Sequence, residues 1–590
     1  MGIPKESDRL VHSCVPESSV RICRSSRGLT EVLFHNHPGH RRVARSWGAW
    51  AGLFAFLTAP CAWGQATPPA DWFDPSGGPG TVILSGGGRI PEEVRGAFVE
   101  AGGGAQCRLV VIPTATPGSD DEEALREGAE VAESWKQREI SSVEVLHTRD
   151  RERANDPAFC EPLRQATAVW FTGGRQSQIA AVYQGTRFEE EVRQVLVRGG
   201  VVGGTSAGAA CQSRVMIVRG QVWETPGLGT IPGVIVDQHF LARDRRGRLL
   251  EALQQHPHLV GLGIDEGTAL VVKGRELKCL GESTVHLCLG ACASLEPCER
   301  VLQPGEVGDL TMFRREALAR QRTPFPPEQP APPVVSSGSL VIVGGGGLTE
   351  QITQRFIELA GGVDAPIVVL PTANPKIDLN EGKFLERAGA KNVTLLTART
   401  WAEVESPETA AVLRQARGLW FGGGRQWRFV DAYEHTQAVA LFHEVLQRGG
   451  VIGGSSAGAT IQGDYLVRGS PLGNTDMMAL GYQRGFAFLP GTAIDQHFRQ
   501  RNRFADLARV VDRHPQLLGI GLDEATALVV TGDVGEILGR GEAHFYDRRP
   551  RRSADAPDHE SVGAGGRYLL RERHVLDRGR KPEPERPKPE

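Results

Sequence analysis

Short runs of apolar, often β-branched residues alternate with longer amphipathic stretches along most of the chain. The runs at 81–84 (Thr-Val-Ile-Leu) and 340–343 (Leu-Val-Ile-Val) predict buried strands, and the stretches 188–198 and 438–448 have the apolar spacing of helices. Strands and helices in this alternation predict an α/β fold, with a mostly parallel sheet covered by helices on both faces. We expect functional sites beyond the carboxyl ends of the strands.

The same pattern occurs twice. Gly-Gly-Thr-Ser-Ala-Gly at 203–208 returns as Gly-Gly-Ser-Ser-Ala-Gly at 453–458, and Asp-Gln-His-Phe at 237–240 returns unchanged at 495–498. Gly-Ile-Asp-Glu at 263–266 likewise returns as Gly-Leu-Asp-Glu at 521–524. A period of about 250 residues is too long for a solenoid repeat, so the chain contains two copies of one globular domain.

The copies set the predicted domain organisation. The first spans 80–320 and the second 339–547, each long enough to bury its own core, and a proline-rich linker at 321–338 joins them. The basic tail at 548–590 is expected to be disordered.

The N-terminal extension, 1–66, is predicted to contain a secretory signal. Basic residues at 41, 42 and 45 precede an apolar run at 47–63, which ends in small and polar residues. This run is too short and too soon interrupted by Pro60 for a stable membrane span, so we expect a secreted or periplasmic protein.

Composition excludes several other classes. The formal net charge is −3 with both signs mixed, so no nucleic-acid partner is expected. The glycine runs at 86–88 and 344–347 do not form a Gly-x-Gly-x-x-Gly motif, and no cofactor is expected. Four cysteines of the first copy, Cys279, Cys288, Cys292 and Cys298, predict one or two local disulfides. A zinc site is the alternative, but the spacing lacks paired Cys-x-x-Cys knuckles, so no metal is expected.

The Gly-x-Ser-x-Gly turns at 204–208 and 454–458 predict nucleophile elbows, which would present Ser206 and Ser456 at a strand-to-helix turn. An acyl transfer also needs N–H donors for the oxyanion. The candidate donors are the amides after each serine and the glycine loops upstream, namely Gly174, Ala207, Gly424 and Ala457.

A serine nucleophile needs a base, and the base needs a third group that orients it. In each copy a histidine follows an apolar run, and a glutamate comes 27 residues later. The candidate triads are Ser206, His239 and Glu266, and Ser456, His497 and Glu524. Asp265 and Asp523 remain alternatives to the glutamates, because adjacent strand residues point to opposite faces and only one of each pair can face the histidine.

Taken together, Gly-Gly-x-Gln, Gly-Thr-Ser-Ala-Gly-Ala, Asp-Gln-His-Phe with spaced arginines, and Gly-Ile-Asp-Glu resemble cyanophycinase and its relatives among the S51 serine peptidases. The resemblance covers both copies. It implies two tandem class I glutamine-amidotransferase-like domains, a Ser-His-Glu triad and no metal. It also implies hydrolysis that releases β-aspartyl-arginine units from cyanophycin, a polyaspartate with arginine branches.

The resemblance also assigns substrate-binding positions, at which guanidinium groups would hold aspartate carboxylates. These are Gln176, Asp237, Gln238, Arg243, Arg245 and Arg248 in the first copy, and Gln426, Asp495, Gln496, Arg501 and Arg503 in the second. Asp506 stands in the second copy where the first has Arg248, which reverses a charge in the expected pocket. The serine-to-histidine distance along the chain is 33 residues in the first copy and 41 in the second, so the first lacks a segment that would shape a pocket wall.

The sequence therefore predicts a secreted tandem serine hydrolase of the cyanophycinase type, acting on a peptide or polymer substrate. The alternatives are a peptidase for other aspartyl or isoaspartyl peptides, and a binding protein with one inactive half. Because relatives commonly form dimers of single domains, we also expect the two halves to pack as an intramolecular pseudo-dimer through corresponding surfaces.

Overall fold

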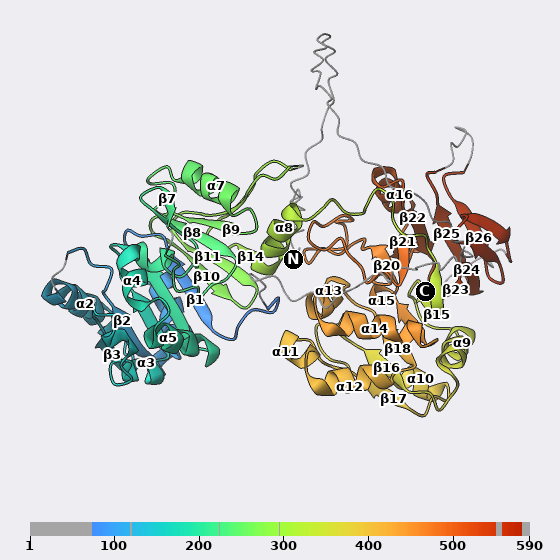
Figure 1. The fold of residues 1–590 in the computed structure, drawn as a ribbon, viewed down its shortest axis with the longest axis horizontal. Coiled ribbons are helices and arrows are strands. Elements are labelled where there is room, and N and C mark those ends of the chain that lie inside the picture. Colours follow the sequence, from blue (N-terminus) through green and yellow to red (C-terminus); the bar gives the residue numbers. More distant parts are fainter. Residues whose placement is uncertain (1–73, 119–120, 224, 294, 550–556, 581–590) are drawn as a thin grey trace, which may run out of the picture. The chain divides into compact units, whose positions relative to one another are not determined.

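The computed structural model describes residues 74–118, 121–223, 225–293, 295–549 and 557–580 (Figure 1). The predicted extension and secretory signal at 1–66 lie outside these residues. Within the described part of the chain, we find no helix that combines the length and the apolar character needed to cross a membrane.

The first half is built on two sheets. The larger has the order β14 (Val307–Asp309), β11 (Glu276–Gly281), β10 (Thr268–Lys273), β1 (Thr81–Ser85), β5 (Val201–Thr205), β4 (Ala168–Phe171), β2 (Arg108–Ile112), β3 (Ser142–Val145). The strands from β1 to β3 pair in parallel, whereas β10, β11 and β14 add an antiparallel extension. The smaller has the order β13 (Cys298–Leu302), β12 (Val285–Leu289), β9 (Val260–Ile264), β8 (Val234–Gln238), and β6 (Met216–Val218) pairs with β7 (Gln221–Trp223).

Alternation along the central strands divides the first core into two layers. Val110 and Ile112 of β2 pack on one face with the helices at 161–165, 176–183 and 187–197, while Leu109 and Val111 pack on the other with those at 92–101 and 121–136. Both faces are apolar, as a parallel sheet covered on both sides requires. The helices are α1 (Glu92–Ala101), α2 (Asp121–Lys136), α3 (Glu161–Gln165), α4 (Gln176–Tyr183), α5 (Arg187–Val197), α6 (Ala207–Ala210), α7 (Arg246–Gln255) and α8 (Leu310–Gln321), with short 3₁₀ turns η1 (Gly104–Gln106) and η2 (Arg153–Asn155).

The second half repeats this plan. Its larger sheet has the order β17 (Val393–Leu395), β16 (Ile367–Leu370), β18 (Gly418–Phe421), β19 (Val451–Ser455), β15 (Val335–Val343), β23 (Thr526–Gly532), β24 (Val534–Gly539), β27 (Arg567–Leu569), β28 (His574–Asp577). The smaller has the order β20 (Gly463–Tyr465), β21 (Leu489–Gln496), β22 (Leu518–Leu522), β25 (Glu542–Tyr546), β26 (Glu560–Gly563). The helices are α9 (Glu350–Ala360), α10 (Lys383–Arg387), α11 (Trp401–Val404), α12 (Pro407–Gln415), α13 (Trp427–Tyr433), α14 (Gln437–Gln447), α15 (Ala457–Thr460) and α16 (Phe504–Arg513). The predicted α/β class is confirmed in both halves.

Two predicted boundaries are wrong. The tail expected to be disordered contributes three strands, β26, β27 and β28, and β27 pairs with β24, so the second domain continues to residue 580. The last residues of the predicted linker belong to β15, which begins at Val335. The linker also packs on the second half, where the ring of Phe325 stacks on Tyr465 at 6.0 Å between centroids.

The predicted disulfides are not formed by Cys279 and Cys288, which are buried thiols in β11 and β12. Burial raises the pKa of Cys279 to about 11 and that of Cys288 to about 12. Both behave as small apolar core residues, which explains why they sit in strands of the sheets rather than in an exposed insertion.

The expected pseudo-dimer contact through corresponding surfaces is also wrong. The ion pairs between the halves join Arg275 and Arg315 of the first to Asp431 and Glu434 of the second, and these residues occupy different places in the repeated domain.

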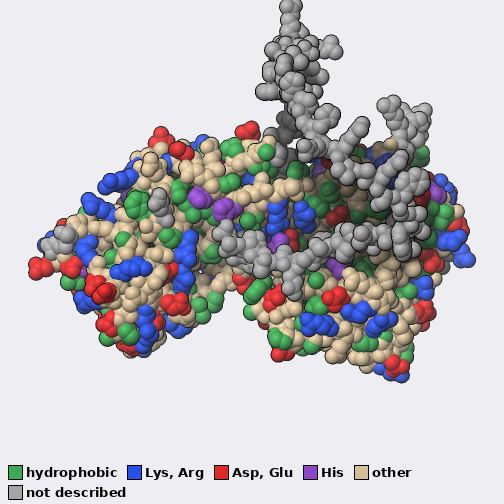
Figure 2. All heavy atoms as spheres, in the orientation of Figure 1, with side chains coloured by type: hydrophobic (Ala, Val, Ile, Leu, Met, Phe, Trp, Pro, Cys, Tyr) green, Lys and Arg blue, Asp and Glu red, His purple; other side chains and the backbone are tan. Residues whose placement is uncertain are grey.

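On the face drawn in Figure 2, Lys and Arg side chains are interspersed with Asp and Glu, in keeping with the mixed charge of the sequence.

Candidate active site

Each nucleophile elbow follows a strand of the larger sheet and opens a short helix. Ser206 lies between β5 and α6 with φ 52°, and Ser456 between β19 and α15 with φ 56°, a conformation that L-residues rarely adopt. The turn is tight, because a Cβ at Gly204 would collide with the backbone of Gly208. The small residues of the motif therefore let the strand and helix approach closely enough to present the serine.

The histidine and glutamate come from the smaller sheet. In the first half Ser206 Oγ lies 2.8 Å from His239 Nε2, and His239 Nδ1 lies 2.5 Å from Glu266 Oε1. In the second half Ser456 Oγ is 3.0 Å from His497 Nε2, and Nδ1 is 2.6 Å from Glu524 Oε1. All six predicted side chains thus come together in two hydrogen-bonded Ser-His-Glu sets, each assembled between two sheets.

The aspartates left open as alternatives hold the turn after the histidine instead. Asp265 accepts the backbone N–H groups of Leu241 and Ala242, each at 3.0 Å, and the hydroxyl of Ser283 at 2.9 Å. Burial alone would raise the pKa of Asp265, but these donors outweigh it and lower the pKa. Asp523 accepts the backbone N–H of Arg499 at 3.1 Å in the same way.

The glycine runs that mimic a dinucleotide motif make room for the histidine. The N–H of His239 donates to the carbonyl of Gly86 and that of His497 to Gly344, both at 2.7 Å. A Cβ at Gly87 would lie 2.7 Å from His239 Nε2, and one at Gly345 would lie 2.6 Å from His497 Nε2. Both glycines have positive φ, 109° and 96°, so neither contact nor backbone favours a side chain here. The sequence pattern does not reveal this role, although both glycine runs follow the first strand of their copy.

Both histidines have a lowered pKa, which favours the neutral imidazole. Burial is the largest cause that lowers the pKa of His239 and His497, and the positive charges of Arg243 and Arg501 add to it. The hydrogen bonds that Glu266 and Glu524 accept from the histidines raise the pKa values but do not reverse the shift. A neutral imidazole with its Nε2 toward the serine hydroxyl can accept a proton from it.

The predicted oxyanion donors lie beside the serines. Ala207 and Ala457 begin α6 and α15, where the first N–H groups of a helix have no acceptor within it. The upstream loops come close, because a Cβ at Gly173 would be 3.6 Å from the Cβ of Ser206. The next residues, Gly174 and Gly424, have φ 130° and 138° and lie against the backbone of Ala115 and Ala373.

Most of the predicted substrate-binding residues of the first half form hydrogen bonds and ion pairs with other residues of the protein. Asp237 is fully buried, and Arg248 pairs with its carboxylate through Nε at 2.7 Å and through a second N–H. Arg245 donates to the carbonyl of Gln238 at 2.8 Å, and Gln238 itself is 6% exposed. Direct substrate contact is therefore wrong for Asp237, and these arginines stabilise the strand end that carries His239.

In the second half, different residues neutralise the buried aspartate that precedes the histidine. Its buried Asp495 pairs with Arg468 through two N–H groups, each at 3.0 Å, and with Arg503 at 2.9 Å. Arg468 also donates to Asp506 at 2.7 Å. The charge reversal at Asp506 is thus compensated by Arg468, which comes from the segment that is longer in this copy and lies outside the repeated motifs.

The glutamines likewise serve the fold. Gln176 Nε2 donates to the carbonyl of Ile217 at 2.9 Å, and Gln426 Nε2 to that of Val467 at 3.0 Å. Gln426 is 1% exposed and Gln496 is 4% exposed, so both are enclosed by protein. Gln176 and Gln426 each hold the segment that follows the nucleophile elbow of their half.

Arg243 and Arg501 remain exposed, one beside each histidine. Their backbone N–H groups donate to the carbonyls of His239 and His497 at 3.0 Å, which fixes them one turn beyond the base. Among the residues predicted to bind substrate, these two have guanidinium groups facing solvent at the site.

One group in the second half has the side chains of a metal site, namely Asp523, Glu542 and His544. The guanidinium group of Arg499 bonds to both carboxylates, at 3.2 Å from Asp523. His544 Nε2 also lies 3.1 Å from Asp523. An arginine therefore supplies the positive charge that a metal ion would bring.

Two α/β halves, each with a nucleophile elbow facing a histidine–glutamate pair, define the class of a serine-type peptidase in tandem. The sequence model of Peptidase family S51 matches residues 82–280 and again 337–538. The chain belongs to this family, with one S51 domain in each half.

Two relatives at 35% sequence identity agree with this assignment. The chain is 35% identical over 228 residues to a cyanophycinase of Geminocystis herdmanii, covering 36% of this chain and 82% of that protein. It is 35% identical over 207 residues to a cyanophycinase of Trichormus variabilis, covering 33% of this chain and 67% of that protein. The crystal structure of a peptidase from an acI-B1 Actinobacterium is 23% identical, with a TM-score of 0.33, and covers 39% of this chain and 96% of that one.

Proposed function

We propose that the protein is an exported, cyanophycinase-like serine peptidase that releases β-aspartyl-arginine units from an arginine-branched polyaspartate. The observation that carries the proposal is the hydrogen-bonded Ser-His-Glu set, present in both halves with Ser-to-His distances of 2.8 and 3.0 Å. A protein that only binds peptide has no need for this arrangement twice.

The geometry supports an acyl-enzyme mechanism. The neutral histidine Nε2 accepts the proton of the serine hydroxyl as the oxygen attacks the carbonyl carbon of the scissile amide. The N–H groups of Ala207 or Ala457 and of the glycine loop donate to the oxyanion. The histidine then gives its proton to the leaving amine, and water repeats the sequence to release the acyl group. Glu266 or Glu524 stabilises the imidazolium in between.

Substrate choice is proposed to come from the exposed arginines. Arg243 and Arg501 lie next to the base and are free of the internal ion pairs that hold Arg245, Arg248 and Arg503. A guanidinium group binds a carboxylate in a bidentate manner, and a polyaspartate backbone offers such groups. The S51 relatives named cyanophycinase support the same substrate class.

The test compares substrates and sites. The purified chain is incubated with cyanophycin, with β-Asp-Arg-containing peptides and with α-Asp-X peptides, and the products are identified by mass. We expect β-aspartyl-arginine from the polymer and a loss of turnover on the order of 10⁴–10⁶ when both Ser206 and Ser456 are replaced by alanine. Cleavage of α-aspartyl peptides alone would instead favour the aspartyl peptidase alternative, and binding without turnover would refute the proposal.

A further inference from the structure

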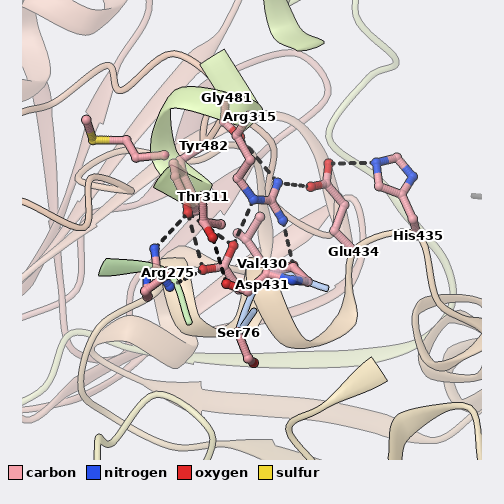
Figure 3. Close-up of polar contacts among 12 residues, drawn as sticks. Ser76, Arg275, Thr311, Arg315, Val430, Asp431, Glu434, His435, Gly481 and Tyr482 are labelled. Carbon is pink, nitrogen blue, oxygen red and sulfur yellow. Dashed lines mark hydrogen bonds and ion pairs between the residues drawn. The ribbon is translucent and has the colours of Figure 1, made fainter. Parts of the chain in front are cut away.

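A buried group of charges joins the two halves around Asp431 (Figure 3). Its carboxylate pairs with Arg315 Nε at 2.7 Å and with Arg275 Nη1 at 2.8 Å, and it accepts the hydroxyl of Tyr482 at 3.1 Å. The two arginines belong to the first half, where Arg315 lies on α8 and Arg275 on the turn between β10 and β11. Asp431 lies on α13 and Tyr482 in the connection between β20 and β21 of the second half.

The N–H groups of Arg315 donate to residues of the second half. Arg315 also pairs with Glu434, and it donates to the carbonyls of Val430 at 3.2 Å and Gly481 at 3.4 Å. Its side chain is 4% exposed. Burial alone would raise the pKa of Glu434, but Arg315 and the neighbouring cations lower it to about 2, so the carboxylate is charged. Charges this deeply enclosed are held in one geometry by their partners.

Arg275 is fixed from its own half. Asp309 accepts from Arg275 Nε at 2.7 Å and also caps α8 by accepting the N–H of Met312 at 2.9 Å. The guanidinium carbon lies 4.4 Å from the ring centre of Trp427, the first residue of α13. The first half therefore holds Arg275 in place from its own side where that residue meets α13.

The contact has no counterpart at the first site. The repeat places Ala181 and Gln184 where the second half has Asp431 and Glu434. Tyr482 belongs to the segment that makes the serine-to-histidine connection eight residues longer in the second copy, 41 against 33. The carboxylates and the longer segment thus occur together, in the half that the arginines contact.

Both contacted elements also build the second site. Just before α13, Arg425 donates to the carbonyl of Ser470 at 2.7 Å and Gln426 to that of Val467 at 3.0 Å. Between these acceptors lies Arg468, which pairs with Asp495, two residues before His497. A continuous set of bonds therefore runs from the first half to the base of the second triad.

We propose that Arg315 and Arg275 are positioning residues for the Ser456 site, and that the first half acts as a permanent partner subunit which holds that site in its working geometry. The proposal rests on the proposed function only in treating Ser456 as a nucleophile. The partner is a second copy of the same domain, fused and specialised. The Ser206 site receives no such support and works independently of the contact.

The experiment uses the full chain with Arg315→Met and the milder Arg275→Gln. A matched control is Arg573→Met, which removes a buried arginine that belongs to the second half, lies 2.9 Å from Asp547 and bonds within that half alone. The first measurement is amide hydrogen exchange, and the second is the rate at which a fluorophosphonate labels each serine, resolved by mass spectrometry of the two peptides.

We expect exchange in 427–434 and 463–488 to rise at least about tenfold in both interface variants, with 201–239 unchanged. Labelling of Ser456 should slow about tenfold while that of Ser206 stays at the wild-type rate. The control should produce neither local pattern. Unchanged exchange and labelling in both variants, equal slowing of both serines, or the same pattern in Arg573→Met would overturn the proposal. If wild-type Ser456 does not react at all, the proposed function fails for the second half. The hydrogen-exchange data alone then decide whether the contact between the halves holds segments 427–434 and 463–488 in place.

Discussion

Replacing Gly345 with alanine should disable the second site without unfolding the second half. The new Cβ would lie 2.3 Å from His497 Cε1 and 2.6 Å from Nε2, whereas ordinary contacts begin at 3.4 Å. The imidazole, whose Nε2 is 3.0 Å from Ser456 Oγ, must therefore withdraw by about 1.1 Å. A misplacement of about 1 Å at a reacting group costs about 100-fold in rate, equivalent to about 2.7 kcal/mol of barrier.

The backbone contributes separately, and a neighbouring glycine isolates that part. Gly345 has φ 96° and Gly347 has φ 104°, so alanine at either position costs about 1–2 kcal/mol of strain. A Cβ at Gly347 meets no atom within 4 Å. Gly347→Ala thus imposes the same strain without touching the histidine.

The assay uses both variants in a Ser206→Ala background, so that only the second half can turn over. The rate of fluorophosphonate labelling at Ser456 and kcat on the peptide substrate are compared with thermal melts of each variant. We expect a loss of about 100-fold for Gly345→Ala and a change of less than about threefold for Gly347→Ala, with similar melting temperatures. Equal rates in the two variants would show that the glycine run does not seat the imidazole.

Four further outcomes are expected. Glu266→Gln should lower turnover at the first site by about 10⁴ with a small change in melting temperature, whereas Asp265→Asn should mainly destabilise the protein, as kinetics paired with melts would reveal. Because the histidine pKa values are lowered, labelling should stay at its plateau as pH falls through 6.5 and decline only in more acid buffer. Arg501→Gln should move the second site's decline to higher pH, since it removes a charge that disfavours the imidazolium, and an unmoved profile would contradict this. Arg468→Met leaves buried Asp495 with one arginine and should lower the free energy of unfolding, measured by urea denaturation, by about 3–5 kcal/mol. An unchanged free energy of unfolding would refute this expectation.

The alternation of apolar runs and the duplication were enough to predict the fold class, both strand-to-helix turns and the histidine beside each serine. These features depend on local spacing and on residue types that chemistry requires together, and each recurs within the chain. Glu266 could not be separated from Asp265, however, because the decision depends on which face of the strand end meets His239. That geometry arises between two sheets, and a linear pattern does not specify it.

The substrate-binding assignments were less successful for a related reason. Arginine, aspartate and glutamine can bind a ligand or each other, and the sequence does not distinguish the two uses. Arg248 and Asp237 satisfy one another, and only the fold reveals that Arg468, far from the motif, does the same for Asp495. The C-terminal strands were missed because their charged, proline-containing surroundings resemble a disordered tail, although pairing with β24 gives them an edge to join.

The unequal contact between the halves also bears on how the chain avoids uncontrolled assembly. A head-to-tail contact between repeated units can in principle continue from one molecule to the next and grow into a filament. Here the surface that supplies the arginines is present in the first half alone, and the surface that supplies the carboxylates is present in the second half alone. The second half has Asp533 where the first has Arg275, and after β27 it turns back into β28 instead of forming a helix like α8. With Ala181 in place of Asp431, the first half in turn offers no carboxylate to an incoming neighbour. Divergence of the two copies therefore ends the series at two units, and any substitution that restored both partners, such as Ala181→Asp with Asp533→Arg, would risk reopening it.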